Sequence, residues 1–427
     1  MKQQLSTILF CLLSCVVFCQ FPKLQWQKII GGSFYEEVPV TIIQTLDKGF
    51  LIAGNTMSND GDVTANRTEG GIGWLVKLNY KGEKEWDKAF GNDKISSALQ
   101  TKEGGYLLLY DSLILQANGS VERREYYLAE INFNGDFTYQ RKLQNKLNLI
   151  ATSASKKNIA VSNPDWFERT KKSESDSSEI QILEIDRDGN IVLLKSLISE
   201  HTQFVSSIQP TKDGGYILSG LITTNKRDQT GNQLFMDGWL AKIDSIGNLA
   251  WRKTISRDGL ELFNSAIQTK DGGYIATGFL TDSIAKIELD PGNKDAPVYI
   301  NYIQNMWVVK FDKTGNLIWE KSLGGSGYDH GVAILEEGDN SFLIVGSTNS
   351  NDKDVTNKIA PAYSLYDNWL VKLDKNGNKL FASCFGGDGR DDVQSVVRTQ
   401  DGGFVTVSIT SSGIGAFDYL VQKFIEK

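Results

Sequence analysis

The sequence has little of the chemistry on which most metal proteins and hydrolases depend. Its 427 residues include only two histidines and four cysteines, and three of these cysteines, Cys11, Cys15 and Cys19, lie near the start of the chain. The fourth, Cys384, stands at an apolar strand position, as is typical of a buried small side chain. A disulfide framework, a cysteine or three-histidine zinc site and a histidine-based triad are therefore not expected.

An excess of positive charge is also missing, because the formal net charge is −7. Proteins that bind nucleic-acid backbones or anionic membrane surfaces need basic surfaces, so neither partner is expected. Phosphate-binding loops, dinucleotide fingerprints, nucleophile elbows and zinc-protease motifs are absent from the sequence. The sequence thus names no reaction.

A long apolar run occurs only at the N-terminus. Residues 1–19 combine a short basic start with an apolar stretch, which is typical of an export signal cleaved near Cys19 and Gln20. A second interpretation makes Cys15 the lipidated residue of a lipoprotein box. No later segment is apolar enough to cross a membrane. We therefore expect a periplasmic or secreted protein, or an outer-membrane lipoprotein, with one domain over 20–427.

Two phrases alternate along the chain. One is W-V-V-K-F-D-K-T-G-N-L-I-W-E-K-S-L-G-G from Trp307, with related copies from Trp74, Trp239 and Trp369. The other is T-K-D-G-G-Y, followed by an apolar run, from Thr211 and Thr269, with the related copy T-Q-D-G-G-F from Thr399. Both phrases alternate apolar and polar residues and end in turn residues, which predicts short strands joined by tight turns.

The repeats predict an all-β fold, a seven-bladed β-propeller with four-stranded antiparallel blades. The residues that mark the end of each unit are 53 to 68 residues apart; they are Trp26, Trp86, Tyr139, Leu194, Trp251, Trp319 and Phe381. A period in this range with four short strands per unit is typical of propellers. The recurrent tryptophans are interpreted as residues that pack the blades.

The two ends of the chain predict how the ring closes. The four strands of each unit are called a to d in chain order. The last unit provides strands a to c, over 393–398, 404–410 and 419–424, but no strand d. The segment 24–32 has the pattern of a strand d without its own unit. Pairing the two completes the seventh blade and leaves no open edge.

These phrases resemble the secreted bacterial β-propeller repeats (SBBP-like repeats) found in exported Gram-negative proteins that use type IX secretion. The resemblance rests on the joint L-G-G-S-G-x-D, Leu323 to Asp329, on the D-G-G-Y hairpin and on W-L-V-K-L-D-x-x-G-N. It implies the propeller fold over 24–427 and a scaffold role, but no particular activity.

The division of each unit into four strands also predicts which face of the ring is functional. Turns a–b and c–d are uniformly short, whereas the b–c connections are long and different in each unit. Because variable loops on a rigid scaffold usually carry binding, we expect the b–c face to bind a partner. Trp166 and Phe167 lie in one of these polar loops and are candidate contact residues.

The segments that connect strand d of one unit to strand a of the next, called the d–a joints, lie on the same face. They bring acidic residues to the mouth of the central channel. The candidate binding residues there are Glu36, Asp93, Asp329, His330, Asp391 and Asp392. They suit a cation or a polyhydroxylated ligand. The alternative is that they bond to nearby backbone N–H groups and hold turns.

A repeated acidic loop is the candidate metal site. S-N-D-G-D-V-T contains Asp60 and Asp62, and S-N-D-K-D-V-T contains Asp352 and Asp354. Alternating Asp oxygens suit Ca²⁺, although neither loop has a downstream bidentate glutamate. Shared ancestry of the repeats explains the recurrence equally well.

Three functions remain open at this point. The first is an exported, monomeric, non-enzymatic propeller that binds a protein or glycan of the cell envelope. The second is a glycoside hydrolase or similar hydrolase that uses carboxylates at the channel mouth. The third is a periplasmic accessory subunit of an outer-membrane machine.

Overall fold

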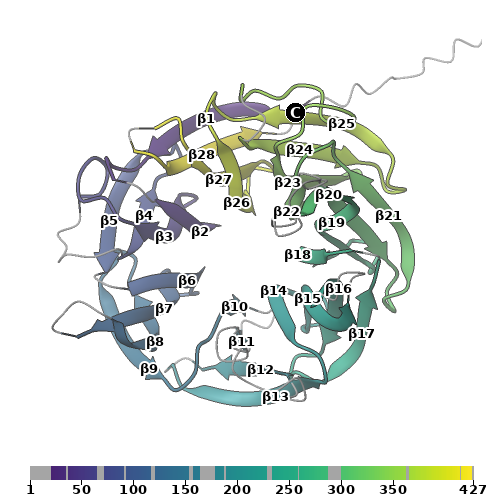
Figure 1. The fold of residues 1–427 in the computed structure, drawn as a ribbon. Coiled ribbons are helices and arrows are strands. Elements are labelled where there is room, and N and C mark those ends of the chain that lie inside the picture. Colours follow the sequence, from purple (N-terminus) through teal and green to yellow (C-terminus); the bar gives the residue numbers. More distant parts are fainter. Residues whose placement is uncertain are drawn as a thin grey trace, which may run out of the picture.

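The computed structural model shows seven four-stranded antiparallel sheets arranged as blades around a central axis (Figure 1). It describes the chain in the following ranges: 21–34, 37–64, 72–90, 93–116, 121–152, 157–163, 178–186, 189–227, 233–257, 259–286, 300–361, 365–413 and 415–425. Strands and turns, but no helix, make up these ranges. Consequently, they hold no helix that could span a membrane.

Each blade is a meander whose strands a to d run outward from the axis (Figure 1). The strands of blades 1 to 3 are β2 (Val38–Gln44), β3 (Phe50–Thr56), β4 (Ile72–Leu78), β5 (Lys84–Phe90), β6 (Asp93–Gln100), β7 (Tyr106–Leu115), β8 (Val121–Ile131), β9 (Phe137–Leu143), β10 (Leu149–Thr152), β11 (Asn158–Ser162), β12 (Ser178–Ile185) and β13 (Ile191–Ser199). The strands of blades 4 to 7 are β14 (Gln203–Pro210), β15 (Tyr216–Arg227), β16 (Gln233–Ile243), β17 (Leu249–Ile255), β18 (Glu261–Gln268), β19 (Tyr274–Lys286), β20 (Ile300–Phe311), β21 (Leu317–Leu323), β22 (Asp329–Glu336), β23 (Phe342–Thr348), β24 (Asp367–Leu373), β25 (Lys379–Phe385), β26 (Asp391–Arg398), β27 (Phe404–Thr410), β28 (Asp418–Ile425) and β1 (Lys23–Ile30).

The predicted fold and ring closure are confirmed. The seventh blade has the strand order β1-β28-β27-β26, so the N-terminal strand forms its outer edge. The register joins Lys23 to Ile425 at one end and Ile30 to Tyr419 at the other. Phe21 also packs against Phe381, Phe385 and Phe424, with ring centroids 6.0 to 6.3 Å apart.

Three of the expected loops are wrong in part, because strands extend into them. The sequence predicted loops over 111–125, 223–238 and 281–305. In blade 2, β7 and β8 continue to the pair Leu115 and Val121; in blade 4, β15 and β16 continue to Arg227 and Gln233; and in blade 5, β19 and β20 continue to Lys286 and Ile300. Residues that favour strands, such as Ile114 in the first loop and Ile303 in the third, take part in these ladders.

The core lies between the blades. Strands b and c are buried on both faces; every residue of β23, for example, is buried. One cluster joins Ile217 and Leu240 of blade 4 to Phe263 and Trp307 of blade 5, whose rings stack at 4.4 Å. Sheet-on-sheet packing of this kind buries the inner faces of successive blades.

The tryptophans at the unit marks pack against glycines of the next blade. A Cβ atom added to Gly315 would lie 2.9 Å from the Trp251 ring, and a Cβ atom added to Gly377 would lie 3.0 Å from the Trp319 ring. These glycines also have positive φ, +79° at Gly315. The interpretation of these tryptophans as packing residues is therefore confirmed, and the turn glycine is needed for space as well as for conformation.

We expect Gly315→Ala to destabilise the fold by about 3 kcal/mol, from the left-handed backbone and from overpacking against Trp251. Gly272 is the matched control, because it has a φ of +84° and nothing within 4 Å of an added Cβ. Gly272→Ala should lower the free energy of unfolding by only about 1 kcal/mol. Chemical denaturation measures both values, and equal losses would show that the contact with Trp251 is unimportant.

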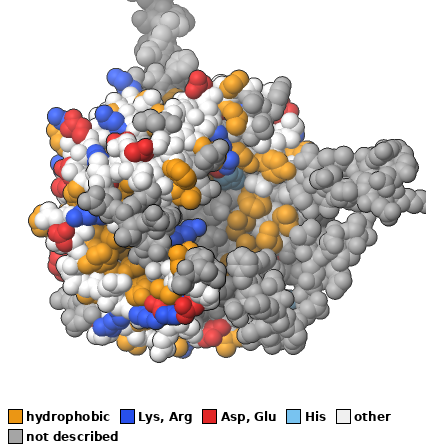
Figure 2. Space-filling model, turned by 60° about the vertical axis from the view of Figure 1, so that its left-hand side comes forward, with side chains coloured by type: hydrophobic (Ala, Val, Ile, Leu, Met, Phe, Trp, Pro, Cys, Tyr) orange, Lys and Arg blue, Asp and Glu red, His pale blue; other side chains and the backbone are white. Residues whose placement is uncertain are grey.

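The outer strands of the ring carry mixed surfaces. Figure 2 shows hydrophobic side chains in small patches among charged side chains of both signs. In β13, for instance, Val192 and Ile198 are exposed on either side of Lys195. Such interspersed charge discourages edge-to-edge pairing of outer strands.

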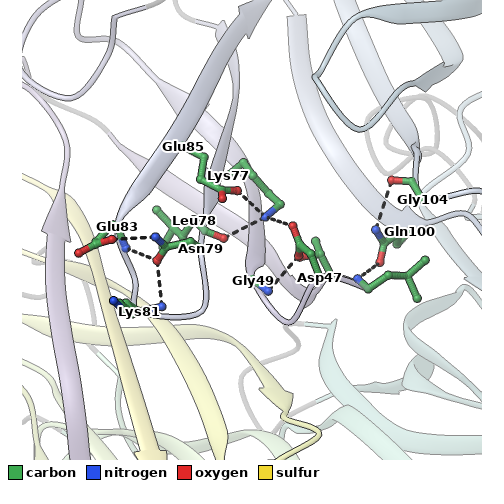
Figure 3. Close-up of polar contacts among 12 residues, drawn as sticks. Asp47, Gly49, Lys77, Leu78, Asn79, Lys81, Glu83, Glu85, Gln100 and Gly104 are labelled. Carbon is green, nitrogen blue, oxygen red and sulfur yellow. Dashed lines mark hydrogen bonds and ion pairs between the residues drawn. The ribbon is translucent and has the colours of Figure 1, made fainter.

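The face with the a–b and c–d turns, called the tight-turn face below, is held by buried lysines that the sequence did not predict. Lys77 of β4 is 3% exposed and bonds to Asp47, Glu85 and the carbonyl oxygen of Leu78 (Figure 3). Five blades repeat the link between a strand c lysine and the aspartate of the a–b turn; the pairs are Lys77–Asp47, Lys242–Asp213, Lys310–Asp271, Lys372–Asp339 and Lys423–Asp401. The lysine stem fills the interior while its ammonium group fixes the turn.

Candidate functional site

The opposite face, called the long-loop face below, carries the b–c connections and the d–a joints. Hydrogen bonds tie the two sets together in blade 6, where Ser326 N of the joint donates to Asp352 Oδ1 of the b–c connection at 2.8 Å. Gly327 N likewise donates to Ser350 Oγ at 2.9 Å. The predicted placement of both sets on one face is thus confirmed in this blade.

The acidic loops proposed for calcium clamp the joint of their own blade. Asp60 accepts from Ser33 N at 2.7 Å, and Asp62 accepts from Gly31 N at 3.2 Å. Blade 6 repeats the pattern, because Asp352 accepts from Ser326 N and Asp354 from Gly324 N. These contacts explain the recurrence of the motif, and calcium binding at either loop stays a prediction.

Metal ligands do not gather elsewhere in the described ranges. Within them, no group of three or more His, Cys, Asp or Glu side chains could hold a metal ion.

Beneath the long-loop face lies a layer of buried carboxyl groups. Its members begin strand a or strand c, except that Glu37 directly precedes strand a, and each is 0% exposed; they are Glu37, Glu261, Asp329, Asp367, Asp391 and Asp418. Asp329 accepts from Gly325 N at 2.7 Å and from Ser350 Oγ at 2.9 Å, and it also bonds to Thr348. Glu37 accepts from Thr56 Oγ1 at 2.9 Å.

Burial governs the protonation of this layer. It raises the pKa of Glu37, Asp329 and Asp367 above their ordinary values. It raises the pKa of Asp391 to about 6, with a smaller contribution from the charges of Asp367 and Asp388. Removing a carboxylate from water disfavours its charged form, and the hydrogen bonds here offset that effect only in part.

This shift makes a testable pH dependence. Because the pKa of Asp391 is higher in the folded state than in the unfolded state, its contribution to stability falls as the pH rises from about 4 to above 6. Asp391→Asn should remove that dependence, so the stability of the variant relative to wild type should improve by about 2–3 kcal/mol between pH 4 and pH 7. Urea denaturation at a series of pH values measures it.

Glu200→Gln is the control, because Glu200 is an exposed carboxylate in another d–a joint, between β13 and β14. Its effect on stability should not follow this pH profile. A constant difference between wild type and Asp391→Asn at every pH would contradict the account.

Several of the predicted binding residues cannot be placed with their side chains. Glu36, Trp166 and Phe167 lie outside the described residues, and so does the predicted export signal, 1–19. Asp93 begins β6, opposite Ser112, but its side chain is not described. Asp329 and Asp391 are present at the joints, but they point into the blade and have no exposed surface.

His330 and Asp392 are the two predicted residues that the structure brings together. They lie on neighbouring blades, with His330 Nε2 3.7 Å from Asp392 Oδ1, and their side chains are 20% and 13% exposed. His330 therefore faces Asp392 and not its sequence neighbour Asp329, because successive residues of a strand point to opposite faces. Burial lowers the pKa of His330, which is neutral at pH 7.

Three residues that the sequence analysis missed complete this cluster. Arg390 Nη2 donates to Asp392 Oδ2 at 3.1 Å. The guanidinium lies against the rings of Tyr366 and Phe417, 5.3 and 5.7 Å from their centroids, and the Tyr366 ring meets that of His330 edge-on at 6.0 Å. We call His330, Tyr366, Arg390, Asp392 and Phe417 the Arg390 cluster.

The sequence held one signal for this cluster. The joint of blade 6 reads G-G-S-G-Y-D-H and that of blade 7 reads G-G-D-G-R-D-D, so Arg390 replaces Tyr328 of the repeat. A residue that differs from its counterparts in the other repeats no longer has the structural role that they share. Tyr366 and Phe417 precede strand c in consecutive blades, but sequence alone did not bring them to one place.

Comparison with known proteins supports the fold but not a family. No protein-family model matches the chain. An uncharacterized WD repeat-containing protein, L264 of Acanthamoeba polyphaga mimivirus, is 20% identical over 196 residues, and the match spans 40% of this chain and 14% of that protein. Membership of the secreted bacterial propeller-repeat family therefore stays a prediction.

Among solved structures, the polysaccharide lyase Uly1 superposes with a TM-score of 0.53 at 11% identity, and the match covers 92% of each chain. BamB from Moraxella catarrhalis gives a TM-score of 0.44 at 10% identity, covering 95% of this chain and all of that one. A protein of unknown function from Dyadobacter fermentans gives 0.43 at 10% identity, over 95% of this chain and 99% of that one. At these identities the likeness to Uly1 shows the propeller fold alone, and the other two superpositions carry no argument.

Proposed function

We propose that the chain is an exported, non-enzymatic β-propeller that binds a protein or glycan of the cell envelope through its long-loop face. One observation carries this proposal, namely the difference between the two faces of the ring. Long and dissimilar connections stand on one face, and near-identical tight turns with buried lysines close the other. A rigid ring with variable loops on one side suits recognition.

The long-loop face also offers accessible chemistry. The side chains of Arg390 and His330 are 35% and 20% exposed, beside the half-buried Tyr366 and Phe417. Arginine and aromatic residues are enriched among the side chains that dominate binding energy at protein interfaces. A partner at this face would meet the Arg390 cluster.

The hydrolase alternative gains no support from the carboxylates first suggested for it. Asp329 and Asp391 are 0% exposed and bonded within their own blade. A glycosidase needs two carboxyl groups that reach opposite sides of a bound sugar ring. These two side chains do not reach solvent at all.

Affinity purification of the mature protein from its own cell envelope tests the proposal. The variant replaces the connections 164–177 and 287–299, which lie between the paired strands of blades 3 and 5, by Gly/Ser turns. We expect the wild-type ring to retain a partner that the variant loses. If that partner were a subunit of an outer-membrane complex, the protein would be its accessory subunit.

A matched variant alters the tight-turn face instead. Tyr80 and Phe133 protrude there, 61% and 65% exposed, and both can be changed to Ser without disturbing the core. The proposal predicts that this variant keeps the partner. A partner lost from this variant and kept by the loop variant would overturn the assignment of the binding face.

A further inference from the structure

The Arg390 cluster presents a hydrogen-bond donor and an acceptor side by side. Arg390 directly precedes β26 and Asp392 is the second residue of that strand, so the two side chains, two positions apart, lie on the same side of the chain. Their contact of 3.1 Å joins Nη2 to Oδ2, while Nε and Oδ1 are shielded from solvent and make no hydrogen bond. The hydrogen-bonding capacity that faces outward therefore lies on the terminal guanidinium nitrogens and on Oδ2.

The pair is held rigidly before any ligand arrives. Tyr366 and Phe417 both lie against the guanidinium. The backbone is fixed too, because Arg390 N donates to Ser411 Oγ at 2.7 Å and Asp391 N donates to the carbonyl oxygen of Tyr366 at 2.7 Å. Such preorganisation reduces the entropy lost on binding.

The charges within the cluster balance. Arg390 is cationic, Asp392 is its anionic partner at 3.1 Å, and His330 beside them is neutral at pH 7. A balanced pair offers no net attraction to a carboxylate, phosphate or acidic peptide. Adjacent donors and an acceptor instead match neighbouring hydroxyl groups, each of which can both donate and accept.

We propose that the Arg390 cluster is a binding site for an uncharged, polyhydroxylated glycan, with Arg390 donating to one sugar hydroxyl and Asp392 accepting from the next. Tyr366 and Phe417 act as positioning residues that hold the guanidinium in place. This inference rests on the proposed function, of which it specifies the ligand class and the contact residues.

Titration calorimetry with defined oligosaccharides at pH 7 tests the inference. The probes are the neutral hexamers of the cello-, malto-, manno- and xylo-oligosaccharide series, with hexagalacturonate and hexaglutamate as anionic probes. We expect at least one neutral hexamer to bind, and Arg390→Gln and Asp392→Asn each to weaken it at least about tenfold, the loss of one hydrogen bond to a charged group.

Asp392→Asn separates the two ligand chemistries. If the site selected anions, loss of the competing carboxylate would strengthen hexagalacturonate or hexaglutamate binding, and the inference would be overturned. It would be overturned equally if no neutral hexamer bound, or if Arg390→Gln left the binding unchanged.

Arg257→Gln is the matched control. Arg257 lies in another d–a joint, is 41% exposed and pairs with Glu320, so it resembles Arg390 in exposure and pairing. It should leave the affinity unchanged, and thermal melts should show all variants folded. If the envelope partner still depended on the loops while no neutral hexamer bound, the glycan inference would fail and the binding-face proposal would stand.

Discussion

Deletion of residues 21–30 is expected to prevent the remaining chain from folding into a stable ring. The seventh blade would lose its outer strand and with it the register that pairs seven residues of β1 with β28. All but the last residue of β28 are buried, so the deletion would expose a strand made for a fully covered position. The deletion would also remove the contacts that Phe21 makes with Phe381 and Phe424 and that Trp26 makes with Phe50.

The expected loss is at least about 5 kcal/mol, which is comparable with the whole stability of many domains. Size-exclusion chromatography and circular dichroism of the deletion variant would show aggregated or unfolded protein. The large effect follows from closure, since the deletion leaves the edge of β28 unpaired and open to association with another chain.

A circular permutant is the control. Lys23 pairs with Ile425, so the start of β1 lies beside the end of β28. A chain that begins at Gly31 and carries residues 21–30 after a short linker at its C-terminus should fold and melt like the wild type. If the deletion variant were as stable as the permutant, ring closure would contribute little.

Asp271→Ala is expected to destabilise the ring by about 3 kcal/mol, because it leaves a buried ammonium group without its carboxylate. Lys310 is 4% exposed in its side chain, whereas Asp271 is 63% exposed. The two residues of the pair are therefore not equivalent. Lys310→Met should change the stability by less than about 1 kcal/mol, because methionine fills the same space and leaves Asp271 in water.

The double variant Asp271→Ala/Lys310→Met should be close to Lys310→Met alone. Urea denaturation of all four proteins measures the coupling, and Lys242 with Asp213 repeats the geometry at 2.9 Å as an independent copy. The contribution of the pair also depends on pH. Hydrogen bonds and the charge of Lys310 lower the pKa of Asp271 to about 2, so its contribution holds above the unfolded value of 3.8 and is lost as the pH falls toward 2. Equal losses for the two single variants would contradict this asymmetry.

The blades and their closure could be predicted because the signals are local. A turn such as Asp271-Gly272-Gly273 has the same effect wherever it stands, and the alternation of strand residues reports which face is buried. The pairing of the N-terminal strand with the last blade could be predicted by counting the strands in each unit. Even so, Lys48 and Asn340 adopt positive φ, 67° and 63°, at turn positions where other blades have glycine.

The alternation of apolar and polar residues gives a wrong prediction for the lysine of strand c. It assigns the lysine of W-L-V-K-L-D to the polar face, but Lys77 and Lys310 are 3% exposed because the face of strand c they occupy is covered and their ammonium groups reach the a–b turn. Only the distance between strand c and the a–b turn decides this, and that distance is a property of the assembled blade.

The candidate site was predictable in location but not in composition. The joints do contain the acidic residues named from the sequence, yet Asp329 points inward and His330 points toward the next blade. Arg390, Tyr366 and Phe417 come from different connections that meet only after blades 6 and 7 have packed together. Contacts between connections of different blades cannot be predicted from the sequence of a single repeat.

The most direct test of the central claim maps which face of the ring meets the partner. Cys384 is 5% exposed and is the only cysteine after the predicted signal, so single exposed cysteines can carry a photo-crosslinker without interference. Probes at Ser326 and Thr356 report on the long-loop face, and probes at Lys313 and Lys375 report on the tight-turn face. Irradiation in the native cell envelope should produce a crosslinked partner from Ser326 or Thr356 and none from Lys313 and Lys375. Crosslinks from the tight-turn probes alone would contradict the claim that the long-loop face is the binding surface.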